Sequence, residues 1–201
     1  MTGITRRQIL LGTLSTGAAL AFGSAARAGV PGPGKAGLLD YARREIDRLR
    51  TSIALRDVVG IADYSLPSSV ARFHLVHMES GSITSFLVAH GRGSDPDHSG
   101  WLQRFSNAPG SNASSRGAYL TGEHYTGKHG RSMRLIGLDP TNNNAEKRAI
   151  VVHGAWYVHP SMILEHGQLG RSEGCFAFAQ SEVDVILQRL GPGRLLLSTR
   201  L

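Results

Sequence analysis

One cysteine, Cys175, stands in the stretch GRSEGCFAF at residues 170–178, and it is the only cysteine among 201 residues. An internal disulfide is therefore excluded, and the thiol is buried and inert, paired with another chain, or kept for its reactivity. Gly174 can adopt backbone angles that are closed to other residues, so this loop can direct a thiol and backbone N–H groups to one point. The context favours a reactive thiol.

A thiol with an ordinary pKa of about 8.5 is mostly protonated at neutral pH, so a nucleophilic Cys175 needs a base or a positive neighbour. His153, in AIVVHGAWYV, ends an apolar predicted strand and is followed by Gly154. A histidine that merely satisfies a strand end is the alternative for any one of nine histidines. The cysteine loop twenty-two residues downstream favours a Cys–His pair.

The pattern HG…GRSxGC resembles the active-site motif of the L,D-transpeptidase catalytic domain, the YkuD-like fold of bacterial cell-wall enzymes. Three stretches resemble the murein L,D-transpeptidase catalytic domain-like branch in order and spacing: FSNAPGSNASSRGAYLTGEHYTGKHGRSMRLIGLD, NNNAEKRAIVVHGAWYV and LGRSEGCFAF. The resemblance covers about residues 73–190.

This resemblance implies that Cys175 is the nucleophile and His153 its base. It implies that Ser172 and Gly174 hold the loop beside Gly154, with the amides of Gly174 and Cys175 as oxyanion donors.

The resemblance also implies a substrate cleft, because SSRGAY is similar to the strand that borders the family's cleft. Tyr119 is the first candidate for substrate contact, followed by Tyr125 and His129. Arg171 is a candidate clamp for a substrate carboxylate or a cation that favours the thiolate; a solvated loop arginine is the alternative.

Glu173 departs from the family pattern, because many members have histidine at this position. Proton transfer would then rest on His153 alone. A carboxylate facing the sulfur would disfavour the thiolate, so Glu173 is expected to face away.

The resemblance implies a peptidoglycan L,D-transpeptidase with stem peptides as donor and acceptor. It also implies a cysteine acyl-enzyme, crosslinks of the three-to-three or one-to-three kind, and sensitivity to carbapenems. An L,D-carboxypeptidase on the same stems and a non-catalytic exported wall-binding domain are the alternatives. A papain-like endopeptidase is disfavoured, because there cysteine precedes histidine. The thioester route needs no cofactor, and the histidine spacings predict no metal site.

Residues 1–28, MTGITRRQILLGTLSTGAALAFGSAARA, have the features of a twin-arginine signal peptide, with cleavage expected after Ala28. A membrane anchor is the alternative, but the apolar run is broken by glycine. The sequence predicts export to the periplasm or cell envelope, with no stable membrane insertion after signal removal.

Removal of the signal takes away three arginines and no acidic residue, so the formal charge falls from +7 to +4. A modest positive charge suits an acidic polymer such as the cell wall. Without a basic run it does not favour nucleic acid.

The remaining chain predicts one mainly β (α+β) domain at 38–201 after a Gly/Pro linker at 29–37. We expect a YkuD-like β-sandwich or barrel with an amphipathic helix at 38–50 and a helix at 181–190, capped by Ser181 and stopped by Gly191. Short strands fill 57–155, HMESGSIT forms a hairpin turn and RLLLSTRL a last strand. The long segment 91–115 is a candidate lid.

Overall fold

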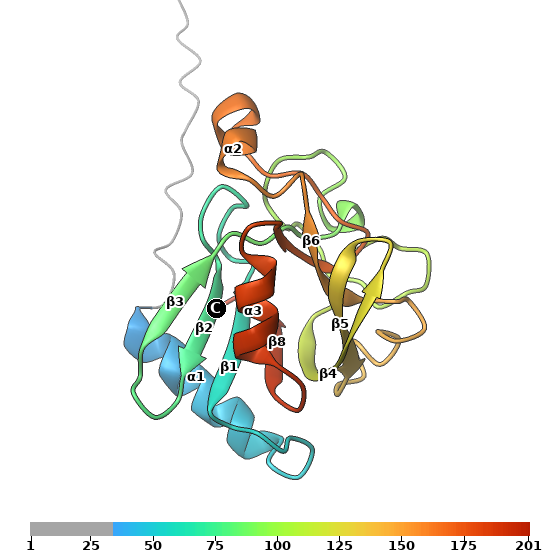
Figure 1. Ribbon diagram of the computed structural model, residues 1–201. Coiled ribbons are helices and arrows are strands. Elements are labelled where there is room, and N and C mark those ends of the chain that lie inside the picture. The colour runs from blue at the N-terminus through green and yellow to red at the C-terminus, as the bar shows by residue number, and fades with distance from the viewer. Residues whose placement is uncertain (1–33) are drawn as a thin grey trace, which may run out of the picture. The chain divides into compact units, whose positions relative to one another are not determined.

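In the computed structural model, which describes residues 34–201, eight strands form one mixed sheet in the order β3-β2-β1-β8-β4-β5-β6-β7 (Figure 1). The strands are β1 Val58–Asp63, β2 Phe73–His77, β3 Ile83–Phe86, β4 Gly117–Gly127, β5 Gly130–Gly137, β6 Val151–Ala155, β7 Phe176–Ala179 and β8 Leu195–Thr199. The predicted signal peptide and linker residues 29–33 lie outside the described residues.

Two strand pairs are parallel, β1 with β8 and β6 with β7, and the other five pairs are antiparallel. A parallel pair needs a long crossover, because the chain must return to the same end of the sheet. The crossover between β6 and β7 runs over residues 156–175 and ends in the cysteine loop. Cys175 is the last residue of this crossover, and His153 is in the middle of β6, just before it.

The sheet closes on itself through the segment after β3. Ala89 forms an antiparallel bridge with Ala177 of β7, and Gly91 forms a parallel bridge with Ser172. The Ala89 amide donates to the Ala177 carbonyl at 3.0 Å. These bridges join the two ends of the strand order, so the expectation of a sheet-rich α+β fold with a sandwich or barrel is confirmed.

Aromatic side chains fill the main core and hold β7 in place. Phe73 and Phe178 meet edge to face at 4.7 Å between ring centroids, and Tyr119 meets Phe176 in the same way at 5.3 Å. Each such pair contributes about 1 kcal/mol beyond its buried area. Since Phe176 directly follows Cys175, this packing fixes the position of residues 170–175, called the nucleophile loop because Cys175 is the candidate nucleophile.

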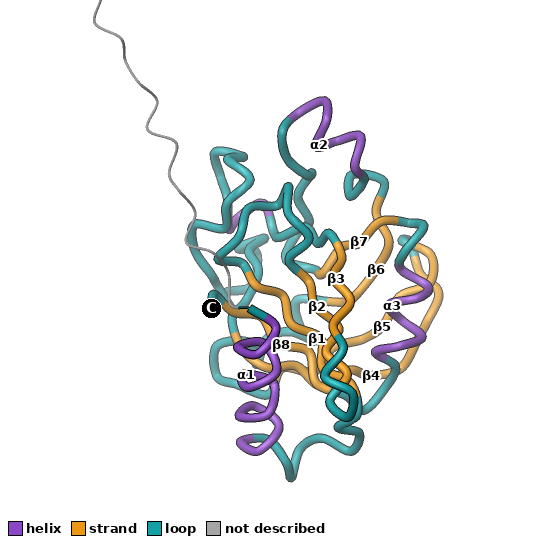
Figure 2. The backbone as a smooth tube through the Cα atoms, turned by 90° about the vertical axis from the view of Figure 1, so that its left-hand side faces the viewer, coloured by secondary structure: helices purple, strands orange, loops and turns teal. Residues whose placement is uncertain are grey.

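Three helices lie around the sheet within residues 34–201: α1 Lys35–Arg48, α2 Pro160–His166 and α3 Val183–Leu190. Figure 2 shows α1 and α3 on opposite sides of the strands, with α2 beyond one end. Leu38 and Ala42 of α1 are buried in a second core with Ile61 of β1. None of the described helices is long and apolar enough to cross a membrane.

The predicted helices and strands agree with the structure except at a few positions. The first helix starts at Lys35 rather than 38, so its first residues belong to the predicted linker. Ser181 is not the cap of α3, whose N-cap is Glu182; Gly191 does end the helix. Helix α2 was not expected; Pro160 stands at its start, and the His159 side chain accepts a hydrogen bond from the Ser161 amide.

Candidate active site

The parallel register of β6 and β7 brings His153 and Cys175 to the same face of the sheet. Val152 pairs with Phe176 and both belong to the main core, whereas His153 pairs with Ala177. Side chains alternate along a strand, so His153 and Ala177 face away from that core, and Cys175 lies two residues before Ala177. Adjacent strands and a two-residue offset give about 8 Å between the Cα atoms of the two residues, a span that a thiol and an imidazole can bridge.

The His153 ring is held in one tautomer. Its Nδ1 lies 2.9 Å from the carbonyl oxygen of Gly154, and a carbonyl can only accept, so Nδ1 carries the proton. The lone pair of the neutral ring is then on Nε2, the atom that a general base needs. His129 stacks on this ring at 4.2 Å between centroids and 20° between planes. The imidazole is therefore fixed in protonation and in orientation.

The Cys175 thiol is partly exposed and contacts the backbone of a strained residue. Its S–H donates to the Ala149 carbonyl across 3.6 Å. Ala149 has a φ of 52°, which is rare for a residue other than glycine and costs about 1–3 kcal/mol. Such backbone strain is concentrated at functional sites in proteins.

The resting pair is neutral, because desolvation acts against both charges. Burial raises the pKa of Cys175, while the Val151 backbone and the cations Lys128 and Arg148 oppose this shift and Glu173 adds to it. Burial lowers the pKa of His153, which the Gly154 carbonyl opposes. The thiol therefore depends on the base to remove its proton during the reaction.

The loop before Cys175 is organised by Ser172, as expected. Its hydroxyl donates to the Cys175 carbonyl at 2.8 Å and accepts from the Gly174 amide at 3.1 Å. The Gly174 amide is thus already engaged, which contradicts its expected role as a free oxyanion donor. The oxyanion role of the Cys175 amide stays a prediction.

The glycine before Cys175 is required by its surroundings. Gly174 has a φ of 114°, and an added Cβ would lie 2.7 Å from the Ala113 carbonyl oxygen, so a side chain there would move the loop that carries Cys175. At Gly154 an added Cβ would meet the end of the exposed Gln180 side chain, which can move aside.

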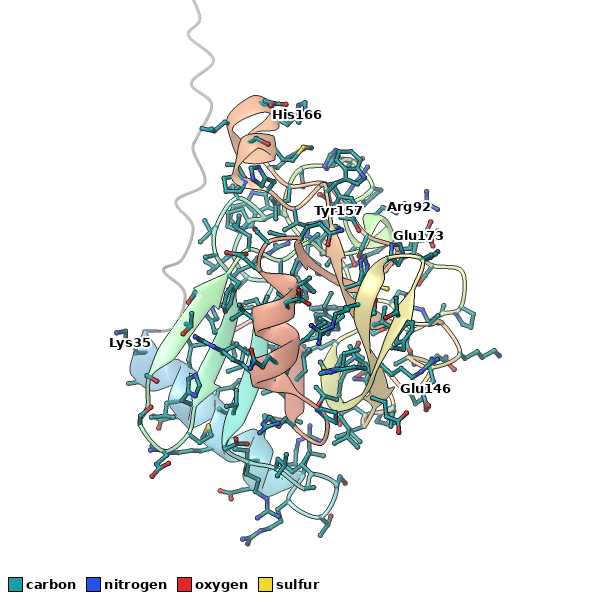
Figure 3. All side chains as sticks on the ribbon, viewed as in Figure 1. Lys35, Arg92, Glu146, Tyr157, His166 and Glu173 are labelled. Carbon is teal, nitrogen blue, oxygen red and sulfur yellow. The ribbon has the colours of Figure 1, made fainter. Side chains whose placement is uncertain are left out.

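The two charged residues of the loop bond to the segment after β3. One Arg171 nitrogen, Nη1, donates to the carbonyls of Asp95 and Pro96, so Arg171 anchors the 91–115 segment; its substrate role stays a prediction. Glu173 pairs with Arg92 at 3.0 Å, and Figure 3 shows these two side chains beside each other. The ion pair directs the Glu173 carboxylate toward Arg92, but Glu173 still raises the pKa of Cys175, so the expectation that it faces away from the sulfur stays a prediction.

The predicted substrate tyrosines occupy different environments. Tyr119 is fully buried in the main core, where its hydroxyl donates to the Ser115 carbonyl, so its burial contradicts a direct substrate contact. Tyr125 is half-buried, and the Arg134 guanidinium lies 4.6 Å from its ring centroid. Tyr125 pairs with Ser132, and Ser132 pairs with His153, so Tyr125 lies about 10 Å from the imidazole strand, within reach of a peptide.

A pocket of about 480 Å³ lies beside the imidazole, between the β4–β5 turn, the end of β6 and the start of α3. It is lined by Lys128, His129, Gly130, Arg131, Gly154, Ala155, Trp156, Tyr157, Gln180, Val183 and Asp184. Cys175 does not line this pocket. His129 belongs both to the pocket and to the stack on His153, so the pocket adjoins the base rather than the thiol.

Sequence reasoning missed three residues of the site: Lys128, Arg148 and Tyr157. Lys128 and Arg148 are the cations that favour the Cys175 thiolate. Burial, then Cys175 and Glu173, raise the pKa of Tyr157 to about 12, which keeps a phenol proton available near the sulfur. Lys128 directly precedes the predicted His129 and Tyr157 comes three residues after the predicted Gly154, whereas nothing in the pattern around Arg148 indicates its position.

Arg148 also connects the site with the candidate lid. Its guanidinium donates to the carbonyls of Ser106 and Ala113 and to the Ser115 hydroxyl. The 91–115 segment is therefore bonded to the nucleophile loop through Arg171 and to the residues before β6 through Arg148, and its role as a lid stays a prediction. Across residues 34–201 no cluster of three metal-ligating side chains occurs.

Comparison with known proteins defines the class of this domain. The sequence model of the L,D-transpeptidase catalytic domain matches residues 35–198, most of the chain. The chain belongs to this family, which confirms the resemblance drawn from its motifs.

Similar solved structures include an L,D-transpeptidase from Mycobacterium smegmatis, at 12% identity and a TM-score of 0.42, covering 71% of this chain and 58% of that one. Another is L,D-transpeptidase 3 from Mycobacterium tuberculosis in complex with a faropenem-derived adduct, at 12% identity and a TM-score of 0.45, covering 72% and 60%. The chain thus spans about three fifths of these proteins' length. None of the curated proteins matches it.

Proposed function

We propose that the protein is an exported peptidoglycan L,D-transpeptidase in which Cys175 is the nucleophile and His153 the general base. The observation that supports this proposal is the parallel β6–β7 register, in which His153 pairs with Ala177, two residues after Cys175, while Nε2 of His153 keeps its lone pair. Membership of the L,D-transpeptidase family supports the reaction class. Lys128 and Arg148 supply positive charge beside the sulfur.

The reaction starts from the neutral pair. Nε2 of His153 takes the thiol proton as the Cys175 sulfur attacks the carbonyl carbon of an L-centre in a stem peptide. The carbonyl π electrons move onto oxygen, to which the Cys175 amide donates a hydrogen bond in this proposal. When the carbon–nitrogen bond breaks, the imidazolium returns its proton to the departing amine of the D-residue. A thioester on Cys175 remains.

The second half of the reaction decides the product. An amine of a second stem attacks the thioester, His153 takes a proton from that nitrogen, and the carbon–sulfur bond breaks to restore the thiol. A diamino-acid side chain as acceptor gives a crosslink, in the three-to-three or the one-to-three register. Water as acceptor gives an L,D-carboxypeptidase.

The pocket beside His153 supports a place for the peptide on the amine side of the scissile bond. It adjoins the imidazole that must protonate the leaving amine and deprotonate the incoming one. Its lining includes the Trp156 and Tyr157 rings and Lys128, together with Arg131, which is paired with Asp184. The pocket therefore offers apolar area and a net positive charge to a peptide that ends in a carboxylate.

The test uses the protein without residues 1–28 and its Cys175→Ala variant, each incubated with disaccharide-tetrapeptides. The products are sequenced by tandem mass spectrometry. A Cys175-dependent dimer supports transpeptidation, and its fragments assign the donor centre. Cys175-dependent loss of the terminal residue alone indicates a carboxypeptidase. No product in either sample overturns the catalytic proposal and favours a wall-binding domain.

Export by the twin-arginine route is a proposal from residues 1–28 alone. Replacement of both Arg6 and Arg7 by lysine should leave the protein unprocessed in the cytoplasm, as read by cell fractionation and by the mass of the N-terminal peptide. Unchanged processing would contradict this route.

A further inference from the structure

A hydrogen-bonded cluster of charged and polar side chains lies buried next to the nucleophile loop and takes no part in the proposed reaction. Arg72 and Asp95 are 0% exposed and His90 is 1% exposed. Fully buried ionised groups are rare in proteins, because each loses its hydration. Such a group persists where its bonds fix a particular arrangement.

All three nitrogens of the Arg72 guanidinium form hydrogen bonds. Its Nε and Nη2 donate to the Val88 carbonyl, at 3.2 and 3.1 Å, and its Nη1 donates to the Leu66 carbonyl at 2.8 Å. Its guanidinium carbon lies 4.9 Å from the Tyr64 ring centroid. These contacts fix the backbone just after β3, the segment that closes the sheet.

His90 links this cation to a carboxylate. Arg72 Nη2 lies 2.6 Å from Nδ1 of His90, and the guanidinium can only donate, so Nδ1 accepts and Nε2 carries the proton. Nε2 then donates to Oδ2 of Asp95 at 3.3 Å. Burial and the neighbouring Arg72 lower the pKa of His90 to about 3, so the link stays neutral at working pH.

Asp95 extends this hydrogen-bonded cluster into the 91–115 segment. Its Oδ1 accepts from the amide and hydroxyl of Ser99, both at 2.8 Å, and its Oδ2 accepts from the Gly100 amide at 2.9 Å. The Asp95 carbonyl accepts from Arg171 of the nucleophile loop. The carboxylate is thus saturated and is not available to act as a base.

The backbone of this cluster is bonded directly to the loop that carries Cys175. The Ser172 amide donates to the His90 carbonyl at 2.9 Å, and the Arg92 amide donates to the Ser172 carbonyl at 2.8 Å. The hydroxyl of the same Ser172 holds the Cys175 carbonyl at 2.8 Å. Only one residue, Ser172, therefore separates the backbone of His90 from that of the nucleophile.

We propose that Arg72, His90 and Asp95 form a positioning network that sets the geometry of the Cys175 loop, with His90 as its central link. The assignment of this role in catalysis rests on the proposed function, whereas its effect on the thiol does not. A displacement of about 1 Å at a reacting group can lower a rate by about 100-fold. The network is thus expected to affect turnover more than substrate affinity.

The test compares two substitutions of similar size at His90. The carboxamide of His90→Gln can accept from Arg72 and donate to Asp95, whereas His90→Leu can do neither. Arg194→Ala is the control, because it removes the 2.8 Å ion pair with Asp57 far from Cys175 in the sheet order. The folded fraction of each variant is measured by circular dichroism.

Two readouts separate this proposal from the proposed function. The first is the rate of Cys175 alkylation by iodoacetamide against pH, which needs no substrate. The second is kcat and KM for disaccharide-tetrapeptides. We expect His90→Leu to change the alkylation profile and to lower kcat about 10- to 100-fold with KM within about twofold, while His90→Gln restores most of both.

The proposal is overturned if His90→Leu, corrected for its folded fraction, matches the wild type or Arg194→Ala in alkylation and in kcat. It is also overturned if His90→Gln behaves as His90→Leu does, because the hydrogen bonds would then not be the cause. If the wild-type protein turns over no stem peptide, the proposed function fails, and the alkylation profiles still decide the role of the network.

Discussion

Two buried histidines on either side of the nucleophile loop differ in how completely their rings are bonded. His90 uses both nitrogens, one toward Arg72 and one toward Asp95. His153 uses only Nδ1, which bonds to the backbone, and its Nε2 keeps a free lone pair. Both are almost fully buried, at 1% and 2% exposure, so burial does not distinguish them.

The difference shows how one domain can contain a structural and a reactive histidine within neighbouring segments. A saturated ring has no lone pair or proton to exchange, so it can only fix geometry. A ring with one nitrogen fixed and the other free is held in place and can still move a proton. The free nitrogen, and not the depth of burial, is therefore what distinguishes His153 as the proposed base.

The strongest way to test this comparison is to replace each histidine by glutamine. His153→Gln keeps a polar group but removes the base, so acylation should fall by about 10²- to 10⁴-fold. His90→Gln keeps both hydrogen bonds, so acylation should stay within about threefold of the wild type. Single-turnover acylation by a carbapenem measures both rates, and similar losses in the two variants would contradict the distinction.

A smaller loss is expected from the backbone that joins the two regions. Gly174→Ala places a Cβ 2.7 Å from the Ala113 carbonyl at a φ of 114°, so it should destabilise the domain by about 1–3 kcal/mol and lower the acylation rate. Gly110→Ala is the matched control, since Gly110 also has a positive φ but nothing within 4 Å of an added Cβ. Thermal unfolding and acylation rates that are equal for the two variants would argue against a fixed loop.

The free lone pair of His153 also predicts a pH profile. Burial lowers the pKa of His153, so the neutral base persists below the ordinary histidine pKa of about 6.5 and kcat/KM should fall only below that value. Burial raises the pKa of Cys175, so its proton is retained above about 8.5 and the basic limb should lie higher than that. A profile of kcat/KM from pH 4 to 10 measures both limbs; an acid limb above pH 6.5 would be inconsistent with the neutral pair.

The comparison also predicts an effect on stability at low pH. The pKa of His90 is about 3 in the folded chain and about 6.5 when unfolded, so between these values the unfolded state binds more protons and stability falls as pH falls. His90→Gln removes this dependence, and its Tm should decline less steeply from pH 6.5 to pH 4. Calorimetry at several pH values checks this, and parallel curves for the two proteins would refute it.

The reactive region was more predictable from the sequence than the structural one. Cys175, His153 and Ser172 follow from a lone cysteine, a histidine at a strand end and a matching motif. His90 and Arg72 carry no such signal, because a buried network is made by contacts between segments that are distant along the chain. The sequence around His90, AHGRGS, does not distinguish it from the other histidines.

Most of the strands could be predicted from the sequence, but the bridges that close the sheet could not. Alternating β-branched and aromatic segments indicate β1 to β6 and β8, and Gly191 indicates the end of α3. The short strand β7 directly follows the cysteine, and its pairing with Ala89 depends on a long-range bridge. Tyr119 was placed in the cleft by resemblance, while its burial follows from core packing against Phe176.

The most direct measurement is the intact mass of the protein after brief incubation with disaccharide-tetrapeptide and acid quenching. The account predicts a covalent adduct equal to the donor stem without its leaving D-residue, mapped to the Cys175 peptide and absent from Cys175→Ala. It predicts the same adduct, formed more slowly, in His153→Gln. Turnover of the substrate with no adduct at Cys175, or equal turnover by Cys175→Ala, would contradict a cysteine acyl-enzyme.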